Sequence, residues 1–413
     1  MVRTSPKSNR MQILKSNTTP GWLALVLMVL LVPMAIPQTT LAMRQDGTLY
    51  QADKVYTMEG EPLSPGQVLV GVDGKITAVG KKINLAGTKP KVVELGDGSV
   101  LMPGLVDPYS QTGLGEDGSD ESTREITPDF RTVDSVDWDK PALLRQLEQG
   151  TTTMCVCPGT QNVFSGIAAI IKTVQNDSSI LNDDGPLVAS LCADPTQRNR
   201  SRSRPDSIFV RQPTNRMGVV WILRKTFDKA RRAEDSNDLL TVQETLDGKR
   251  PLMIVSRMSY DLTSVASLAD EFGFSPILVG GQEAYKVKQM IAERKYPVIL
   301  QRQTTGSIFG PERSKLCWNQ AGLLAQSGIT FAFSGDDLLE QARFAHRYGL
   351  AKDQSLAAIT STPAQLLGVA NQVGTIRVGK DADLIALDGE PLEFTTSIRW
   401  VMVNGQINEM DKE

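Results

Sequence analysis

Several polar residues come directly after apolar runs, at points where strands would end and expose their last side chains. Arg257 follows "LMIVS", and Gln301 and Arg302 follow "PVIL". Asp336 and Asp337 close "TFAFSGDD". Carboxylates can act as general acids or bases or hold hard cations, whereas guanidinium and amide groups bind anions. These residues can act together if the fold brings the ends of the runs to one place.

Three further polar residues extend this set. Tyr109 and Gln111 lie in "VLMPGLVDPYSQTGL", and Lys172 follows the apolar run "IAAII". Lys172 also fits a second interpretation, in which its stem packs on apolar surface while its ammonium group reaches water. We expect a polar, donor-rich cavity suited to a small polar or anionic ligand such as a carboxylate or a phosphate. Its predicted lining is Tyr109, Gln111, Lys172, Arg257, Gln301 and Arg302.

Nucleophilic catalysis has little support in the chain. Ser110, Ser256 and Ser334 occur near the ends of apolar runs, but there is no Gly-x-Ser-x-Gly pattern. The glycine patterns of phosphate loops and of dinucleotide sites are also absent. The chain contains one histidine, His346, which flanks an apolar stripe in "LLEQARFAHRYGL". We expect this histidine on the surface of a helix.

The elements that would position these residues differ between the ends of the chain and its middle. Residues 48–103 and the C-terminal stretch alternate apolar and polar residues between turns, and Asp73-Gly74 is a hairpin signal. The middle alternates short apolar runs with amphipathic helical patterns, which predicts parallel strands with right-handed crossovers. The expected strands are 152–157, 187–192, 252–257, 276–280, 297–301 and 330–334. The expected helices include 140–150, 284–295, 319–328 and 338–350.

These patterns predict an α/β protein in which a (β/α)8 TIM-type barrel is inserted into a small β-sandwich. We place the barrel at 104–372 and the two parts of the sandwich at 43–103 and 373–413. Residues 1–42 read as a signal peptide, because four cations precede an apolar stretch and small residues end at Ala42. We therefore expect an exported, periplasmic or extracytoplasmic protein. Membrane attachment would require this segment to stay uncleaved.

Charge and cysteine content exclude two classes of protein. Removal of residues 1–42 takes away four cations and no acids, which leaves 40 Lys and Arg against 47 Asp and Glu, a net charge of −7. This balance gives no electrostatic reason to bind nucleic acid. The four cysteines do not indicate a disulfide framework. We expect Cys155 and Cys157 to point to opposite faces of a strand, so that they cannot chelate one metal ion together.

Five stretches give the chain a specific resemblance. They are "VLMPGLVDPYSQTGL", "GTTTMCVCPGTQNVFSGIAAIIKT", "RQPTNRMGVVWILRKTFDKA", "PILVGGQEAYKV" and "STPAQLLGVANQVGTIRVGKDADLIALDGEPL". Together they resemble the amidohydrolase superfamily, in particular its imidazolonepropionase-like branch, along nearly the whole chain after residue 42. In the second stretch the resemblance aligns a Gly-rich loop that ends in a family lysine, here Lys172. The resemblance implies the barrel-and-sandwich fold, hydrolysis of carbon–nitrogen bonds and, by analogy, self-association.

The resemblance also implies one or two divalent metals, Zn or another, at the carboxyl ends of the barrel strands. The first His-x-His pair of the family falls here on Tyr109 and Gln111. The second pair falls on Val255 and Arg257, and a further histidine falls on Gly280, which we add to the predicted cavity. The acid after the last strand is kept as Asp336. One histidine in the chain cannot rebuild such a site, so we expect no metal cofactor.

Two hypotheses follow for the centre of the predicted barrel. An Arg257–Asp336 ion pair could replace the missing cation electrostatically, or Arg257 could reach solvent without a particular partner. An all-oxygen cation site from Asp107, Asp336 and Asp337 is a further alternative.

Two functions from different classes remain open. The first is a non-catalytic homologue that binds a ligand or assembles with an identical or paralogous partner. The second is a hydrolase of carbon–nitrogen bonds, non-peptide or in cyclic amides, that acts through an atypical site with Asp336 as its catalytic residue.

Overall fold

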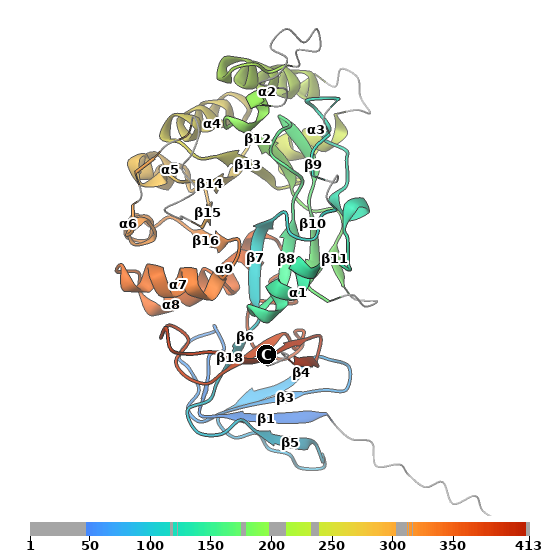
Figure 1. The fold of residues 1–413 in the computed structure, drawn as a ribbon, viewed down its shortest axis with the longest axis vertical. Coiled ribbons are helices and arrows are strands. Elements are labelled where there is room, and N and C mark those ends of the chain that lie inside the picture. Colours follow the sequence, from blue (N-terminus) through green and yellow to red (C-terminus); the bar gives the residue numbers. More distant parts are fainter. Residues whose placement is uncertain are drawn as a thin grey trace, which may run out of the picture. The chain divides into compact units, whose positions relative to one another are not determined.

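The computed structural model describes residues 47–115, 119–121, 123–174, 179–197, 212–232, 239–302, 312, 314–315 and 317–409. The predicted signal peptide at 1–42 lies outside the described residues. The mixed α/β composition is confirmed (Figure 1). None of the helices in this described part is both long and apolar enough to cross a membrane.

Two sheets are built from the ends of the described chain, as the alternating patterns predict. The first has the order β4-β3-β1-β5 and uses residues before position 95. The second has the order β19-β18-β17-β6-β2 and combines both ends of the chain. The strands of the first sheet are β1 (Thr48–Ala52), β3 (Gly66–Val70), β4 (Ile76–Gly80) and β5 (Lys91–Glu94). Those of the second are β2 (Lys54–Val55), β6 (Val100–Pro103), β17 (Leu384–Leu387), β18 (Ile398–Val403) and β19 (Gln406–Glu409).

A shared apolar cluster connects these two sheets. Tyr50 and Val68 of the first sheet are buried with Leu101, Leu384 and Met402 of the second. Burial of one face of each sheet against the other is the reason why both stretches alternate apolar and polar residues along their strands.

The middle of the chain contributes two further sheets. One has the order β11-β10-β8-β7, and the other has the order β16-β15-β14-β13-β12-β9. Strands β12 to β16 are parallel to one another, and β7 is parallel to β8. The strands are β7 (Leu105–Ser110), β8 (Thr151–Val156), β9 (Phe164–Ile167), β10 (Ala169–Lys172), β11 (Ile180–Asn182), β12 (Leu187–Ser190), β13 (Leu252–Ser256), β14 (Pro276–Gly280), β15 (Val298–Gln301) and β16 (Phe331–Ser334).

The expectation of serial parallel units is wrong after β8. Strand β10 pairs antiparallel with β8, and β9 pairs antiparallel with β12. No helix lies between β8 and β10 in this described stretch, so the chain lacks the βα crossover that would bring β10 back parallel to β8. The stretch that we aligned to a Gly-rich loop ending in Lys172 forms these two antiparallel strands.

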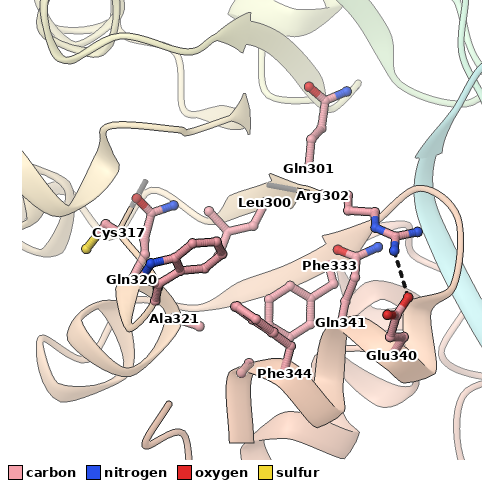
Figure 2. Close-up of a pocket in the computed structure, with 12 residues that line it drawn as sticks. Leu300, Gln301, Arg302, Cys317, Gln320, Ala321, Phe333, Glu340, Gln341 and Phe344 are labelled. Carbon is pink, nitrogen blue, oxygen red and sulfur yellow. Dashed lines mark hydrogen bonds and ion pairs between the residues drawn. The ribbon is translucent and has the colours of Figure 1, made fainter. Parts of the chain in front are cut away.

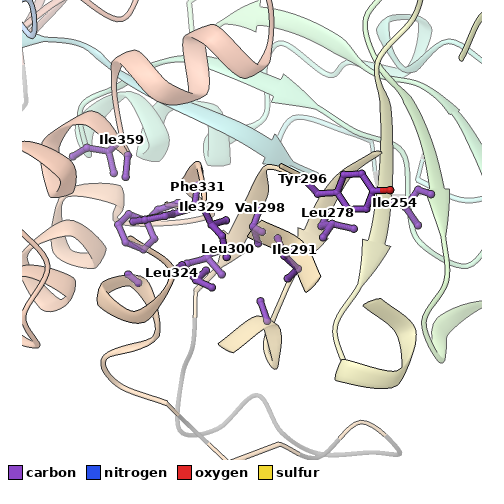
Figure 3. Close-up of a cluster of buried hydrophobic side chains, with 14 of the residues drawn as sticks. Ile254, Leu278, Ile291, Tyr296, Val298, Leu300, Leu324, Ile329, Phe331 and Ile359 are labelled. Atoms are coloured by element: carbon purple, nitrogen blue, oxygen red, sulfur yellow. The ribbon is translucent and has the colours of Figure 1, made fainter. Parts of the chain in front are cut away.

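A large apolar cluster lies between the parallel strands and the helices (Figure 3). Leu278, Val298 and Phe331 from the strands are buried with Ile291 and Leu324 from the helices. The six strands predicted in the middle are confirmed to within two residues at each end. The helices are α1 (Pro141–Glu148), α2 (Arg216–Arg231), α3 (Leu240–Leu246), α4 (Ser259–Phe272), α5 (Lys288–Arg294), α6 (Gln320–Gln326), α7 (Leu338–Arg347), α8 (Lys352–Ala357) and α9 (Ser361–Leu366).

Candidate functional site

Arg257 is the centre of a charged cluster at the carboxyl end of β13. Its guanidinium donates from Nη2 to Asp194 at 2.7 Å and from Nη1 to Asp194 and Glu312 at 3.0 and 2.9 Å. Thr160 donates to the same Asp194 carboxylate at 2.6 Å, and the backbone N–H of Ala193 donates to Glu312 at 2.6 Å. Each carboxylate thus has a second donor that holds it in place.

The predicted Arg257–Asp336 ion pair is therefore wrong. Arg257 is already held by Asp194 and Glu312, and Asp336 accepts a hydrogen bond from Gln146 at 2.5 Å instead. Asp194 begins a short 3-10 helix after β12, and Glu312 belongs to none of the described helices or strands, so both partners were missed. Asp194 could have been predicted as a site residue, because it follows the apolar run "LVASLC" at the expected end of a strand. No sequence pattern marks Glu312 as a site residue.

The electrostatics of this cluster favour its charged form. Burial alone would raise the pKa of Asp194, but the hydrogen bonds and the charge of Arg257 outweigh it and leave the pKa below its ordinary value. Burial alone would lower the pKa of Arg257, and its acidic partners raise it instead. One guanidinium faces two carboxylates, so the cluster offers no free positive charge to an anionic ligand.

Gly280 lies directly beside this cluster. A side chain added to Gly280 would meet Cγ of Arg257 at 3.1 Å and Oε1 of Gln301 at 3.5 Å. Its φ of +95° is a further reason for glycine at this position. The structure therefore brings Arg257, Gly280 and Gln301 together, and the long side chain of Arg257 uses the space that Gly280 leaves.

Tyr109 lies near Arg257, in a second apolar cluster that includes the strand residues Val188 and Val255. Its side chain is 4% exposed and its hydroxyl has no hydrogen-bond partner within the described part of the chain. Cys157 and Cys192 are buried in the same apolar cluster. Burial raises the pKa of Tyr109 and of both thiols, so all three groups stay protonated at neutral pH. None of them is activated as a nucleophile.

The prediction for Cys155 and Cys157 is wrong. Their Sγ atoms lie 3.7 Å apart, because residues two apart on a strand point to the same face. All four cysteines are free thiols.

Asp107 is an acid buried within β7. It accepts hydrogen bonds from the backbone N–H groups of Tyr109 at 3.1 Å and of Gly335 at 3.3 Å. Burial nevertheless raises the pKa of Asp107 to about 8, and the charge of Asp336 adds to the rise. Asp107 is therefore a neutral acid at pH 7.

The other predicted site residues lie elsewhere. Gln111 is exposed and donates weakly to the Pro158 carbonyl at 3.4 Å. Arg302 is paired with Asp337 and Glu340 at 3.0 and 2.7 Å. The predicted cavity, with all its cations facing one ligand, does not form among the described residues.

Lys172 lies at the other end of the strands. It is fully buried and forms ion pairs with Asp383 and, at 3.1 Å, with Asp381. Lys75 pairs with the same Asp381 at 2.7 Å. These two aspartates belong to the closing block "VGKDADL", so part of that motif holds β17 to β10.

The residues at the strand ends do not fit a divalent metal. A protonated phenol, a guanidinium and a glycine occupy positions where the resemblance expects imidazoles, and none of these groups is a metal ligand in that state. Among the described residues there is no group of three or more His, Cys, Asp or Glu that could hold a metal ion. This also removes support for the all-oxygen alternative. His346 is exposed on α7 and its Nδ1 contacts the Leu350 carbonyl at 2.8 Å, which confirms a helix-surface histidine.

Replacing Arg257 with alanine is expected to lower the free energy of unfolding by about 3 kcal/mol at pH 7, because two partly buried carboxylates lose their cation. The lowered pKa of Asp194 means that this stabilisation is present above the unfolded pKa of an aspartate and is lost as the pH falls. The deficit of the variant should shrink in acid. Urea unfolding measures it, with Arg224→Ala, which breaks an exposed pair with Glu271, as a control that costs about 0–1 kcal/mol. Equal losses in both variants would contradict the buried role of Arg257.

Comparison with known proteins supports the amidohydrolase superfamily. A model of the amidohydrolase family matches residues 317–409. The amidohydrolase tasK of Hapsidospora irregularis is 25% identical in an alignment 401 positions long, and the match covers 82% of this chain. The chain spans 39% of the length of that relative.

Solved structures share the fold. An amidohydrolase from Thermotoga maritima MSB8 has a TM-score of 0.78 and 26% identity, over 87% of this chain and 99% of that one. An adenosine deaminase from Xanthomonas campestris, solved with bound zinc, has a TM-score of 0.52 and 16% identity, over 89% and 95% of the two chains. At that identity the second match reports the fold alone.

Proposed function

We propose that this amidohydrolase-superfamily protein no longer hydrolyses its substrate and serves instead as a ligand-binding or assembly protein. The observation that carries the proposal is the cluster of Arg257, Asp194 and Glu312. In the family, imidazoles and a metal would generate the attacking hydroxide at these strand ends. Here a saturated ion-pair cluster takes that region, and the nearby Tyr109 is protonated.

The pairing of Arg257 with Gly280 supports the same proposal. Restoring a large side chain at Gly280 would bring it against Cγ of Arg257 at 3.1 Å. Two positions at which the resemblance expects metal ligands have therefore changed in a complementary way, one to a large residue and one to the smallest. Such a matched change is expected when the site is repacked for stability.

We also propose the finer fold assignment, a TIM-type barrel and a β-sandwich. Strands β7 and β16 belong to different sheets, but the Gly335 N–H after β16 donates to Asp107 on β7. This contact supports a barrel that closes there through side-chain contacts. The apolar cluster shared by the two terminal sheets supports the sandwich. The assignment to the imidazolonepropionase-like branch rests on the closing block "VGTIRVGKDADL".

Export and partnership are further parts of the proposal. The n-region and apolar stretch within residues 1–42 support export to a periplasmic or extracytoplasmic compartment. By analogy with the superfamily, we propose that the chain associates with a second polypeptide, identical or paralogous.

Purified full-length protein is expected to contain no stoichiometric Zn, Mn or Fe and to hydrolyse none of a panel of cyclic and linear amides. Elemental analysis after gentle purification and product chromatography measure the two properties. Stoichiometric metal together with turnover would overturn the proposal. If metal-free turnover is found, Asp336→Asn against the neighbouring Asp337→Asn separates the alternatives. Loss of turnover confined to Asp336→Asn would establish the atypical hydrolase.

A further inference from the structure

The carboxylate of Glu312 occupies a compact anion site at the carboxyl end of β13. Two donors from separate parts of the fold hold it, Nη1 of Arg257 at 2.9 Å and the backbone N–H of Ala193 at 2.6 Å. The side chains of Arg257 and Glu312 are 19% and 11% exposed, so water and salt screen this pair only in part. A guanidinium and a backbone N–H that meet at one carboxylate are donors with which proteins also bind the carboxylate of a ligand.

Glu312 is held less firmly than Asp194, the other carboxylate of the cluster. Asp194 accepts hydrogen bonds from both terminal nitrogens of the Arg257 guanidinium, at 3.0 and 2.7 Å, and from the Thr160 hydroxyl at 2.6 Å. Glu312 accepts one hydrogen bond from the guanidinium and belongs to none of the described helices or strands. Bidentate pairing adds both energy and geometric definition. A competing carboxylate therefore exchanges with Glu312, while Asp194 stays in place.

Exchange of one carboxylate for another leaves the charge of the cluster unchanged. Arg257 already faces two carboxylates, so the cluster has no charge to spare for an additional anion. A ligand carboxylate in place of Glu312 takes over the same two donors, and it fits into the space that the Glu312 carboxylate leaves. The released Glu312 side chain moves into water, where its charge is hydrated.

We propose that Glu312 is an internal substitute for the carboxylate of a ligand, and that a small carboxylate binds Arg257 and the Ala193 N–H by displacing it. This inference rests on the ligand-binding part of the proposed function and names the chemical class of the ligand. Because the tethered glutamate competes at the effective concentration that its chain provides, a simple carboxylate binds the wild-type protein weakly. The natural ligand needs contacts beyond its carboxylate to displace Glu312.

Removal of the internal carboxylate opens the site for a test on the full-length protein. In Glu312→Ala, acetate should bind with a Kd on the order of 10 mM, as measured by saturation-transfer NMR and calorimetry. Acetate at about ten times this Kd should raise the Tm of the variant by about 2 °C. Acetamide, which has the same shape without the charge, and chloride at equal ionic strength should not. In wild type, the acetate Kd should be on the order of tenfold higher, because Glu312 must first be displaced.

The pair of Arg302 and Glu340 supplies a matched control. Arg302 also faces one aspartate and one glutamate, Asp337 at 3.0 Å and Glu340 at 2.7 Å. Figure 2 shows the Arg302–Glu340 pair, whose side chains are 36% and 50% exposed. Glu340→Ala therefore removes a glutamate from a similar arginine without opening a shielded site, and acetate should not raise its Tm.

The proposal is overturned if acetate has no effect on Glu312→Ala, or if acetamide, chloride or the Glu340→Ala control gives an equal effect. Equal acetate affinities in wild type and Glu312→Ala would show that Glu312 does not occupy the site. Absence of acetate binding to wild type at about thirty times the Kd of the variant would show that Glu312 is not displaced. If Glu312→Ala does not fold in chloride buffer, its refolding yield in acetate against chloride carries the same test. None of these readouts depends on a metal or on turnover, so the assays of the proposed function can fail or succeed independently.

Discussion

Replacing Lys172 with methionine is expected to lower the free energy of unfolding by about 3–5 kcal/mol. Lys172 is fully buried between Asp381 and Asp383, and Asp383 is itself buried. Methionine keeps most of the volume of the side chain but leaves Asp383 without its cation. Within the described part of the chain, Asp383 then retains a hydrogen bond from the backbone N–H of Asn404 at 2.9 Å. Urea unfolding at pH 7 measures the loss.

Two further variants separate this effect from lost packing. Lys249→Met removes a lysine that pairs with Asp247 at the surface, and it should cost about 0–1 kcal/mol. In the double variant Lys172→Met with Asp383→Asn, the second change should cost less than Asp383→Asn alone, because the charge that it removes is already unpaired. Additive losses would contradict the ion pair as the source of the stability.

Asp107→Asn is expected to stabilise the protein increasingly as the pH rises from 5 to 8. The pKa of Asp107 is about 8 in the folded protein and close to 3.8 in the unfolded chain. The folded state therefore binds more protons between these values. The stability due to this group is fully present below the unfolded pKa and is lost as the pH rises through the folded pKa. The linkage corresponds to about 1.4 kcal/mol for each pH unit in this window.

Unfolding free energies of wild type and Asp107→Asn at pH 5, 6, 7 and 8 measure this difference. The asparagine variant lacks the titrating group, so its curve should fall less steeply with pH. Asp97→Asn removes an exposed carboxyl group and is expected to run parallel to wild type. Parallel curves for wild type and Asp107→Asn would show that the Asp107 carboxyl is ionised in the folded protein.

Local patterns determined much of the fold in advance. The apolar runs and amphipathic stretches of the middle became strands and helices within a few residues, because periodic burial depends on neighbours along the chain. The direction of β9 and β10 was missed, although no helix separates either strand from β8. Which faces two cysteines share was also a local property, and Cys155 and Cys157 obey the period of two.

The candidate site was also predicted from the sequence only in part. The sequence alone determined that one histidine is available and that a tyrosine, an arginine and a glycine stand where the resemblance expects ligands. Only the tertiary structure decided that Arg257 pairs with Asp194 and Glu312, and that Lys172 pairs with Asp383, which lies 211 residues away in the chain. The physical reason is that composition limits the available chemistry, whereas ion-pair partners depend on which distant segments the fold brings within hydrogen-bond distance.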